Sequence, residues 1–399
     1  MFKPGRLDIF KKWNSFNWER QKMDKKTGEM TVTPWEVSGK VDYQRLMKEF
    51  GIKLLGKLPE IFNENVLFRR KIVFAHRDFE KILECIKNKK PFVMMTGLMP
   101  SGKFHLGHML LALQMVFYQK LGAKIYIAVA DLEAYNARQK SLEELRKVAV
   151  DQYLLNYSAL GLDLEKCDVY FQSERSNNPE KSNAYYRLAS NFSRYATFNE
   201  FRAVYGDLTP GKMNASLLQA ADMYHPQLTE FEGGSVPTFI PVGIDQDPHI
   251  RIARGMASRN KDHKFLPIAS TYNLFLPGLK GGGKMSSSDE NSFIAMTDNP
   301  REVEQKIRKY AFSGGRDTEE EHRKKGGNPD VDVSFQYLRM FFEPDDEKLR
   351  KIEEDYRSGK LLTGELKEYL IKKVNAFLRE HQEKREKARK QAERFLYKN

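Results

Sequence analysis

The sequence is poor in cysteine: Cys85 and Cys167 are the only two among 399 residues, and they do not form a CxxC pair. This scarcity excludes a disulfide framework and a cysteine-rich zinc site, and it fits a reducing compartment. No apolar run approaches the roughly 20 residues that a membrane span needs. The first residues lack the apolar core of a signal peptide, and Asp8, Glu19 and Asp24 argue against a mitochondrial transit segment. We therefore expect a cytoplasmic protein that spans no membrane.

Positive charge is abundant. The chain carries 67 Lys and Arg against 54 Asp and Glu, a formal net charge of +13. Such a balance favours a polyanionic partner such as nucleic acid, although a basic surface often serves only solubility. An apolar content of 40% with 12% aromatic residues is ample for a globular core, and the length indicates two or three domains.

Strand and helix patterns alternate through the middle of the chain. We predict strands over residues 92–95, 124–130, 168–172 and 238–242, and helices over 106–121 and from 141 to about 160. This alternation predicts an α/β fold with a doubly wound, Rossmann-like parallel sheet. Ligands of such sheets bind beyond the carboxyl ends of the strands, near the switch point. Thr96, Asp131 and Gly243 all fall at such ends.

The composition divides the chain into four regions. Residues 1–30 read as a basic, weakly ordered extension, and residues 31–70 as a small element packed on the main body. Residues 71–297 form the α/β domain, which includes a helical, aromatic-rich insertion at about 174–224. Residues 298–399 read as helical throughout, with helix starts near Asp317 and at Thr363.

The first candidate site is the stretch Pro100-Ser-Gly-Lys-Phe-His105-Leu-Gly107-His108, which follows a strand and opens a helix. His105 and His108 are three residues apart, so they share one side of the first helical turn. We expect them to lie beside unpaired backbone N–H groups, where phosphate binds well. Gly107 would let a flat adenine approach the backbone. A chance or structural histidine pair is the plain alternative, and a zinc pair lacks a third ligand at convincing spacing.

The second candidate site is Lys284-Met285-Ser286-Ser287-Ser288, on a loop that begins with Gly281-Gly-Gly283. By itself it could be a solvated polar loop. Combined with the first motif on an α/β pattern, it indicates a lysine loop that closes over the phosphates of a nucleotide. Such a site stabilises charge on an α-phosphate and on a departing pyrophosphate, without a covalent protein nucleophile.

These two motifs resemble the HIGH and KMSKS motifs of the class I aminoacyl-tRNA synthetases. Thr96-Gly97, Ala130-Asp131-Leu-Glu133, Gln219-Ala-Ala-Asp222 and Gly243-Ile-Asp245-Gln246 are similar to segments of the subclass that activates tryptophan and tyrosine. Segments that include Ala311-Phe-Ser-Gly-Gly-Arg316-Asp317 and Gly326-Gly-Asn328 resemble the tryptophanyl-tRNA synthetases of archaea and eukaryotes. The resemblance covers about residues 30–399.

The resemblance implies activation of L-tryptophan with ATP and Mg²⁺, followed by transfer to tRNA(Trp), in a homodimer. Residues 298–399 would then bind the anticodon, with Arg316 and Asp317 as candidates. His105 and His108 would hold the phosphates and Lys284 the pyrophosphate, with no dedicated metal ligands. The remaining ATP-binding candidates are Thr96, Gly97, Pro100, Gly107, Gly243, Asp245, Gln246, Met285, Ser286, Ser287 and Ser288. A tyrosyl-tRNA synthetase or another nucleotidyltransferase remains the alternative.

The amino-acid pocket departs from the family pattern. Eukaryotic-type enzymes hold the indole nitrogen with a tyrosine and a glutamine, where this sequence has Met95 and Ala128. Asp222 occupies the place of the indole-binding aspartate of bacterial tryptophanyl enzymes. A buried carboxylate could accept an indole N–H or a phenol O–H equally well. We expect Asp222 to accept the indole N–H and Glu133 and Gln219 to lie near the substrate amino group, with Met95 beside them.

Overall fold

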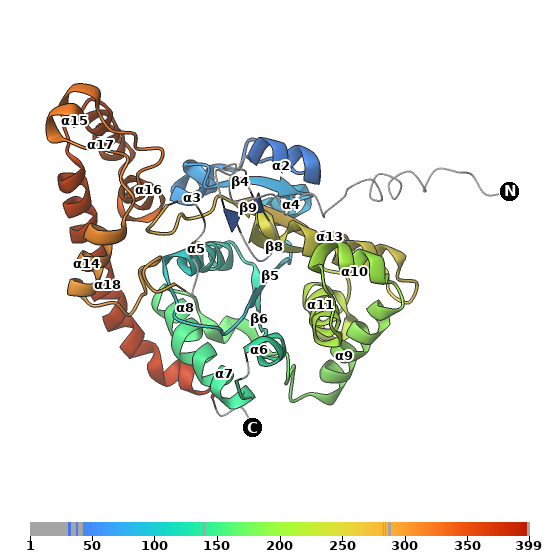
Figure 1. Ribbon diagram of the computed structural model, residues 1–399. Helices are drawn as coiled ribbons and strands as arrows, with labels where there is room; N and C mark the ends of the chain where they lie inside the picture. Colours follow the sequence, from blue (N-terminus) through green and yellow to red (C-terminus); the bar gives the residue numbers. More distant parts are fainter. Residues whose placement is uncertain are drawn as a thin grey trace.

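The computed structural model describes residues 31–32, 37–38, 43–138, 140–281, 283, 285 and 289–396 (Figure 1). The extension predicted over residues 1–30 lies outside the described residues, as do Lys284 and Ser286–Ser288. In the described part of the chain, no helix is both long enough and apolar enough to cross a membrane.

A seven-stranded sheet forms the centre of the described structure, in the order β3-β4-β9-β8-β5-β6-β7. The strands β9, β8, β5, β6 and β7 run parallel, whereas β3 and β4 are antiparallel additions at one edge. The bounds are β3 Lys53–Leu54, β4 Val73–Arg77, β5 Val93–Leu98, β6 Lys124–Val129, β7 Cys167–Phe171, β8 Thr238–Gly243 and β9 Ala269–Asn273. A separate pair joins β1 (Thr31–Val32) to β2 (Val37–Ser38). The predicted α/β class and the four predicted strands are confirmed, but the strands β1 to β4 and β9 were not predicted.

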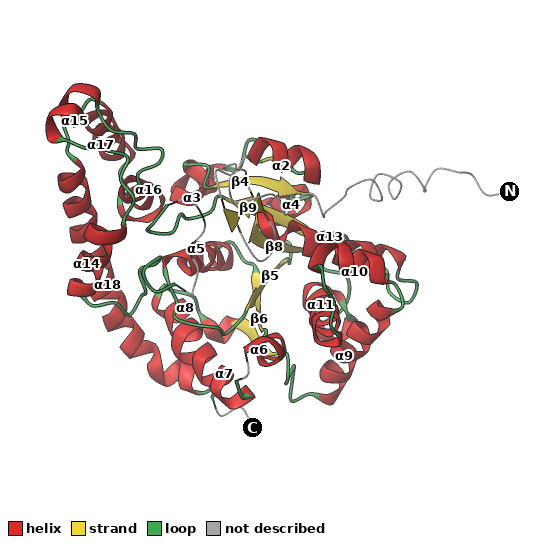
Figure 2. Ribbon diagram, viewed as in Figure 1, coloured by secondary structure: helices red, strands yellow, loops and turns green. Residues whose placement is uncertain are grey.

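Alternate side chains of the central strands point to opposite faces and form two cores. Met94 and Ile127 belong to one core, and Met95 and Ala128 belong to the other. Helices cover both faces (Figure 2). The first core includes residues of α5 (Leu106–Lys120), η3 (Ala149–Leu154) and α8 (Leu155–Ala159), and the second includes residues of α9 (Pro179–Ser193), α10 (Phe198–Tyr205), α11 (Pro210–Tyr224) and α13 (Asp247–Arg259). The other α-helices described before residue 298 are α2 Tyr43–Phe50, α3 Val66–Arg69, α4 Glu80–Asn88, α6 Asp131–Arg138, α7 Leu142–Val148 and α12 Thr229–Glu232.

The sheet opens between β5 and β8. All six residues of β5 pair with β6, but only Val93 and Met94 pair with β8. Pro241 lies in the part of β8 that has left β5, and proline has no N–H to donate to a neighbouring strand. The strand order reverses at this place, because β6 and β7 continue on one side of β5 while β8 and β9 lie on the other. A parallel sheet binds its ligands at such a switch point.

From Pro300 onward the described elements are helices. They are α14 (Pro300–Tyr310), α15 (Glu319–Lys325), α16 (Val333–Tyr337), η7 (Leu338–Phe342), α17 (Asp346–Arg357) and α18 (Thr363–Glu393). The predicted helix start near Asp317 is confirmed, with Thr318 as the capping residue of α15, and α18 begins at the predicted Thr363. This long helix runs back along the α/β domain and packs against α8 (Figure 1).

Candidate functional site

The two histidines of the first motif cap the start of α5. The Nδ1 atom of His105 accepts the Gly107 N–H at 3.1 Å, and the Nδ1 atom of His108 accepts the His105 N–H at 3.2 Å. The two rings stack with centroids 3.8 Å apart, so the predicted shared side is confirmed. The N–H groups of His105 and Gly107 are therefore paired with imidazoles, and the expectation that such groups are unpaired was wrong for these two. Because Nδ1 accepts, the proton of each neutral ring resides on Nε2.

Both rings are neutral at physiological pH. Burial lowers the pKa of His108 to about 4. Burial, with a further contribution from His108, lowers the pKa of His105 well below its ordinary value. A neutral imidazole with its proton on Nε2 can donate a hydrogen bond to a phosphate oxygen without adding positive charge.

Several buried histidines should make the protein sensitive to acid. Burial lowers the pKa of His108, His249 and His381 to about 4 each, whereas an unfolded histidine titrates near 6.5. The folded state then binds fewer protons than the unfolded state, so its stability is complete above pH 6.5 and is lost as the pH falls toward 4. Each of these residues accounts for up to about 3 kcal/mol. We expect the Tm to fall steeply between pH 6.5 and 4.5 in thermal denaturation.

A variant separates this effect from general acid denaturation. His249→Asn keeps a polar atom near the position of Nδ1, which lies 2.8 Å from the Tyr205 hydroxyl, and it has no group that titrates. Its Tm should depend less on pH than that of the unaltered protein. Asp222 works in the opposite sense, because its raised pKa favours the folded state in acid. If the Tm of both proteins changed equally with pH, the contribution of His249 to the acid sensitivity would be contradicted.

The segment that follows the second motif lies against the first. The Leu106 N–H donates to the Ile294 carbonyl at 3.2 Å, and His105 forms an isolated β-bridge with Ala295. A Cβ atom added at Gly107 would lie 3.0 Å from the His105 ring and 3.5 Å from the Met285 sulfur. Glycine at this position therefore gives room to the His105 ring, a reason that the sequence did not suggest. Met285, the one described residue of the second motif, therefore lies close to the start of α5.

Two cavities open where β5 and β8 separate. One, of about 350 Å³, extends from Met95 to Asp222. The other, of about 440 Å³, reaches His108 at the start of α5. Gly97, Gly243 and Gln246 line both cavities, so the two cavities adjoin at these residues.

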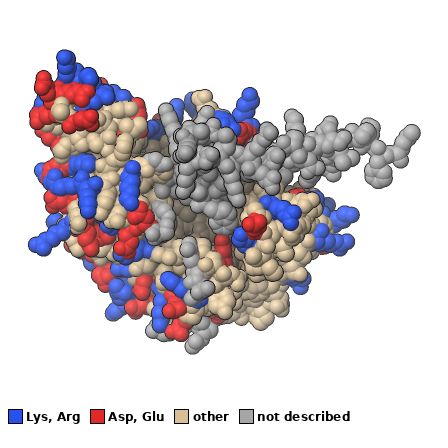
Figure 3. Space-filling model, viewed as in Figure 1, with Lys and Arg blue, Asp and Glu red and all other residues tan. Residues whose placement is uncertain are grey.

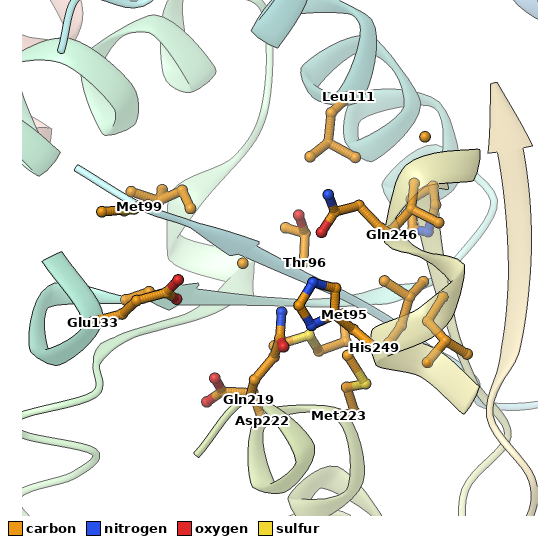
Figure 4. A pocket seen from close by; sticks show the side chains of 18 of the residues that line it. Met95, Thr96, Met99, Leu111, Glu133, Gln219, Asp222, Met223, Gln246 and His249 are labelled. Atoms are coloured by element: carbon orange, nitrogen blue, oxygen red, sulfur yellow. The ribbon is translucent and has the colours of Figure 1, made fainter. Parts of the chain in front are cut away.

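Ten of the sixteen predicted site residues that the structure describes line these cavities. The first cavity is lined by Met95, Thr96, Gly97, Glu133, Gln219, Asp222, Gly243 and Gln246. The second is lined by Gly97, Gly107, His108, Gly243 and Gln246. Figure 4 shows Glu133 of α6 and Gln219 and Asp222 of α11 around Met95 and Thr96. Pro100, His105 and Asp245 are buried beside the cavities and do not line them. Arg316 and Asp317 line neither cavity and are exposed between α14 and α15.

Asp222 is the centre of a buried polar cluster. Its Oδ1 atom accepts the hydroxyls of Tyr170 at 2.7 Å and Tyr185 at 2.8 Å, and its Oδ2 atom accepts the Gln172 amide at 2.8 Å. Burial raises the pKa of Asp222 to about 6 in spite of these hydrogen bonds. Burial and the nearby charge of Asp222 also raise the pKa of Glu133. Two carboxyl groups held this way favour a ligand that brings hydrogen-bond donors or positive charge.

Tyr170, Gln172 and Tyr185, which hold the Asp222 carboxylate, were not predicted from the sequence. Gln172 is the first residue after β7 and donates its backbone N–H to the Val129 carbonyl at the end of β6. The rule that identified Asp131 at the end of β6 could therefore have identified Gln172. The tyrosines carry no such signal, because each could equally be a core residue of its strand or helix.

Side chains outside the cavities pack against the segment at the end of β8. A Cβ atom at Gly243 would lie 2.5 Å from Asp245 Oδ1 and 2.8 Å from the Phe275 ring, so a larger residue would displace these side chains. Asp245 accepts the Gln246 amide at 3.0 Å. Asp247, at the start of α13, is buried and accepts Arg77 at 2.9 Å. These contacts fix Gln246 at the junction of the two cavities.

Comparisons with known proteins agree with this geometry. The sequence model of the family described as tRNA synthetases class I (W and Y) matches residues 87–379. A tryptophan–tRNA ligase of Methanocaldococcus jannaschii is 42% identical over 372 residues, which are 92% of this chain and 98% of the relative. The structure of a tryptophanyl-tRNA synthetase from Aeropyrum pernix is similar with a TM-score of 0.83 at 41% identity, covering 89% of this chain and 96% of that one. The synthetase from Giardia lamblia gives 0.79 at 31% identity, covering 90% and 96%.

Proposed function

Because the chain belongs to the tryptophan–tRNA ligases, within the class I tRNA synthetases, we propose how its residues perform the two steps of that reaction. The tryptophan carboxylate attacks the α-phosphate of ATP, which forms tryptophanyl-adenylate and releases pyrophosphate. The terminal adenosine of tRNA(Trp) then takes the tryptophanyl group. The two joined cavities carry this proposal, because one offers buried carboxyl groups and the other lies at the paired histidines.

The cavity at α5 is proposed to bind ATP. His105 and His108 donate from neutral Nε2–H groups to phosphate oxygens, and Lys284, outside the described residues, binds the pyrophosphate. Asp245 or Gln246 contacts the ribose, near the junction of the two cavities. Thr96, Gly97, Pro100, Gly107, Gly243, Met285 and Ser286–Ser288 complete the nucleotide site. We propose that Mg²⁺ enters with ATP, bound by its phosphates and by water; in the described part of the chain, no three His, Cys, Asp or Glu residues are grouped to hold a metal ion.

The cavity at α11 is proposed to bind tryptophan. Asp222 accepts the indole N–H, in the remaining acceptor capacity of a carboxylate that already takes three donors. Glu133 and Gln219 lie near the α-ammonium group, and Met95 contacts the ring. This arrangement places the substrate carboxylate toward Gly97 and Gln246, where the second cavity begins.

The helical region from residue 298 onward is proposed to bind the anticodon of tRNA(Trp), with Arg316 and Asp317 among the contacts. Lys and Arg side chains are spread over this region and alternate with acidic ones, without one continuous basic patch in the view of Figure 3. The net charge of +13 is consistent with a polyanionic partner. We further propose a homodimer in the cytoplasm, and a division of the chain at residues 30, 70 and 297.

Amino-acid-dependent ATP–pyrophosphate exchange tests the proposal. Tryptophan should support exchange, and tyrosine and phenylalanine should support it at least about 1,000-fold less in kcat/KM, because polar recognition in a buried site rejects ligands that leave a group unpaired. Relatives named as tryptophan–tRNA ligases do not favour the tyrosyl alternative. Exchange that depends on tyrosine, or on no amino acid, would refute the proposal.

A further inference from the structure

Two adjacent residues of α18 are connected to the first motif, Pro100–His108, by separate chains of hydrogen bonds. Helix α18 begins in the helical region, where the Thr363 hydroxyl accepts the Ser313 hydroxyl at 3.1 Å. His381 and Gln382 lie later in the same helix, where it packs on the α/β domain. Both are at least partly buried, and each holds a different element of that domain.

Gln382 holds the segment that follows the second motif. Its Nε2 atom donates to the carbonyl of Met296 at 3.1 Å and to that of Asp298 at 3.0 Å. The Met296 N–H in turn donates to the Phe104 carbonyl at 2.9 Å. The amide of Gln382 is thus two hydrogen bonds away from the residue that precedes His105.

His381 reaches the same residue from the other side. Its Nε2 atom lies 2.7 Å from Asn156 Oδ1, and the Asn156 amide donates to the Gln152 carbonyl at 2.5 Å. The Gln152 side-chain oxygen then accepts the Phe104 N–H at 3.4 Å. Since Asn156 Oδ1 can only accept, the His381 ring donates through Nε2.

The two chains of contacts meet at the two backbone groups of Phe104. The Phe104 ring also contacts the His108 ring at a centroid distance of 5.2 Å. The residue before a helix cap sets the direction in which the chain enters the helix. Contacts that hold both the N–H and the carbonyl of Phe104 therefore restrain the backbone at the start of α5, from which His105 and His108 project.

We propose that His381 and Gln382 are positioning residues for His105 and His108 and thereby affect the rate of tryptophan activation. This inference rests on the proposed function, because it assigns a role in that reaction. The two residues touch no substrate in this arrangement. They act through Phe104, and a displacement of about 1 Å at a reacting group is enough to lower a rate by up to about 100-fold.

The test is a set of variants in tryptophan-dependent ATP–pyrophosphate exchange. Gln382→Leu should lower kcat by about tenfold or more and leave the tryptophan KM within about twofold. His381→Leu should have a similar effect, and His381→Gln, which keeps a donor for Asn156, should restore most of the rate. Glu380→Gln breaks only the exposed pair with Lys384 one turn later, so it serves as the control and should leave kcat unchanged.

A double-mutant cycle distinguishes positioning from simple stabilisation. If Gln382 acts through His105 and His108, Gln382→Leu should cost little further rate in a His108→Asn background. The inference would be overturned if the double variant lost kcat by the product of the two single-variant factors. A kcat that falls only in proportion to the folded fraction measured by circular dichroism would also overturn it. Loss of His381→Gln rescue would overturn it for His381. Absence of tryptophan-dependent exchange in the unaltered protein would instead refute the proposed function.

Discussion

Replacing His108 with asparagine should lower kcat for tryptophan-dependent ATP–pyrophosphate exchange by about 100- to 1,000-fold, the usual effect of losing one well-placed donor in a transition state. The asparagine side-chain oxygen lies near the position of Nδ1, so it can still accept the His105 N–H that His108 accepts at 3.2 Å. The Nε2–H donor that we propose for the nucleotide cavity is lost. The variant should therefore fold normally and fail in phosphate stabilisation, which steady-state exchange and thermal denaturation measure together.

His108→Gln is the matched control for this prediction. Its amide nitrogen lies near the position of Nε2, so it should keep more activity than the asparagine variant. The tryptophan KM should change little in either variant, because His108 lines the second cavity and not the first. Equal kcat values for His108→Asn and the unaltered protein would show that the ring has only a structural role.

Asp222→Ala should reduce kcat/KM for tryptophan by about 100-fold or more, mainly through KM. The change removes the proposed indole acceptor, and it also leaves the hydroxyls of Tyr170 and Tyr185 and the Gln172 amide without their shared acceptor. Each buried donor left unpaired costs about 1–3 kcal/mol, so the Tm should fall as well. Exchange kinetics at varied tryptophan and varied ATP will separate the two substrates.

The ATP KM provides the internal control for Asp222, because Asp222 does not line the cavity at α5. Asp222→Asn keeps the shape and one acceptor, and it should be less damaging to stability than the alanine variant. A tryptophan KM close to that of the unaltered protein in Asp222→Ala would refute the assignment of this carboxylate to the indole nitrogen.

The sequence predicted the parts of the fold whose signals are local. The strands around Met94, Ile127, Val169 and Ile240 are apolar and regularly spaced, and they were found. Strand β9, Ala269-Ser-Thr-Tyr-Asn273, has few apolar residues and becomes a strand because β4 and β8 flank it on both sides. Its identity depends on partners distant in the sequence, and no local pattern contains that information.

The site shows the same division. Position at the strand ends predicted that Thr96 and Gly243 would lie in one site, and the family resemblance added Gln219 and Asp222 of α11. The cavity at β5 and β8 brings all four together. The sequence did not predict that the His105 and His108 rings would accept hydrogen bonds from backbone N–H groups at the start of α5, because these hydrogen bonds depend on side-chain conformation. Nor did it predict the tyrosines that hold Asp222, since a hydroxyl aimed at a buried acid looks like any other core aromatic in the sequence.

The gap between β5 and β8 has a consequence for how binding energy is used. The gap is made by the backbone, since the two strands stop pairing after Met94 and Pro241 offers no N–H to close it. The cavity that we propose for tryptophan therefore exists before either substrate arrives, and no sheet hydrogen bonds need to break when the substrates enter. A preorganised site of this kind pays little in ordering on association. More of the interaction energy remains available for the transition state of adenylate formation.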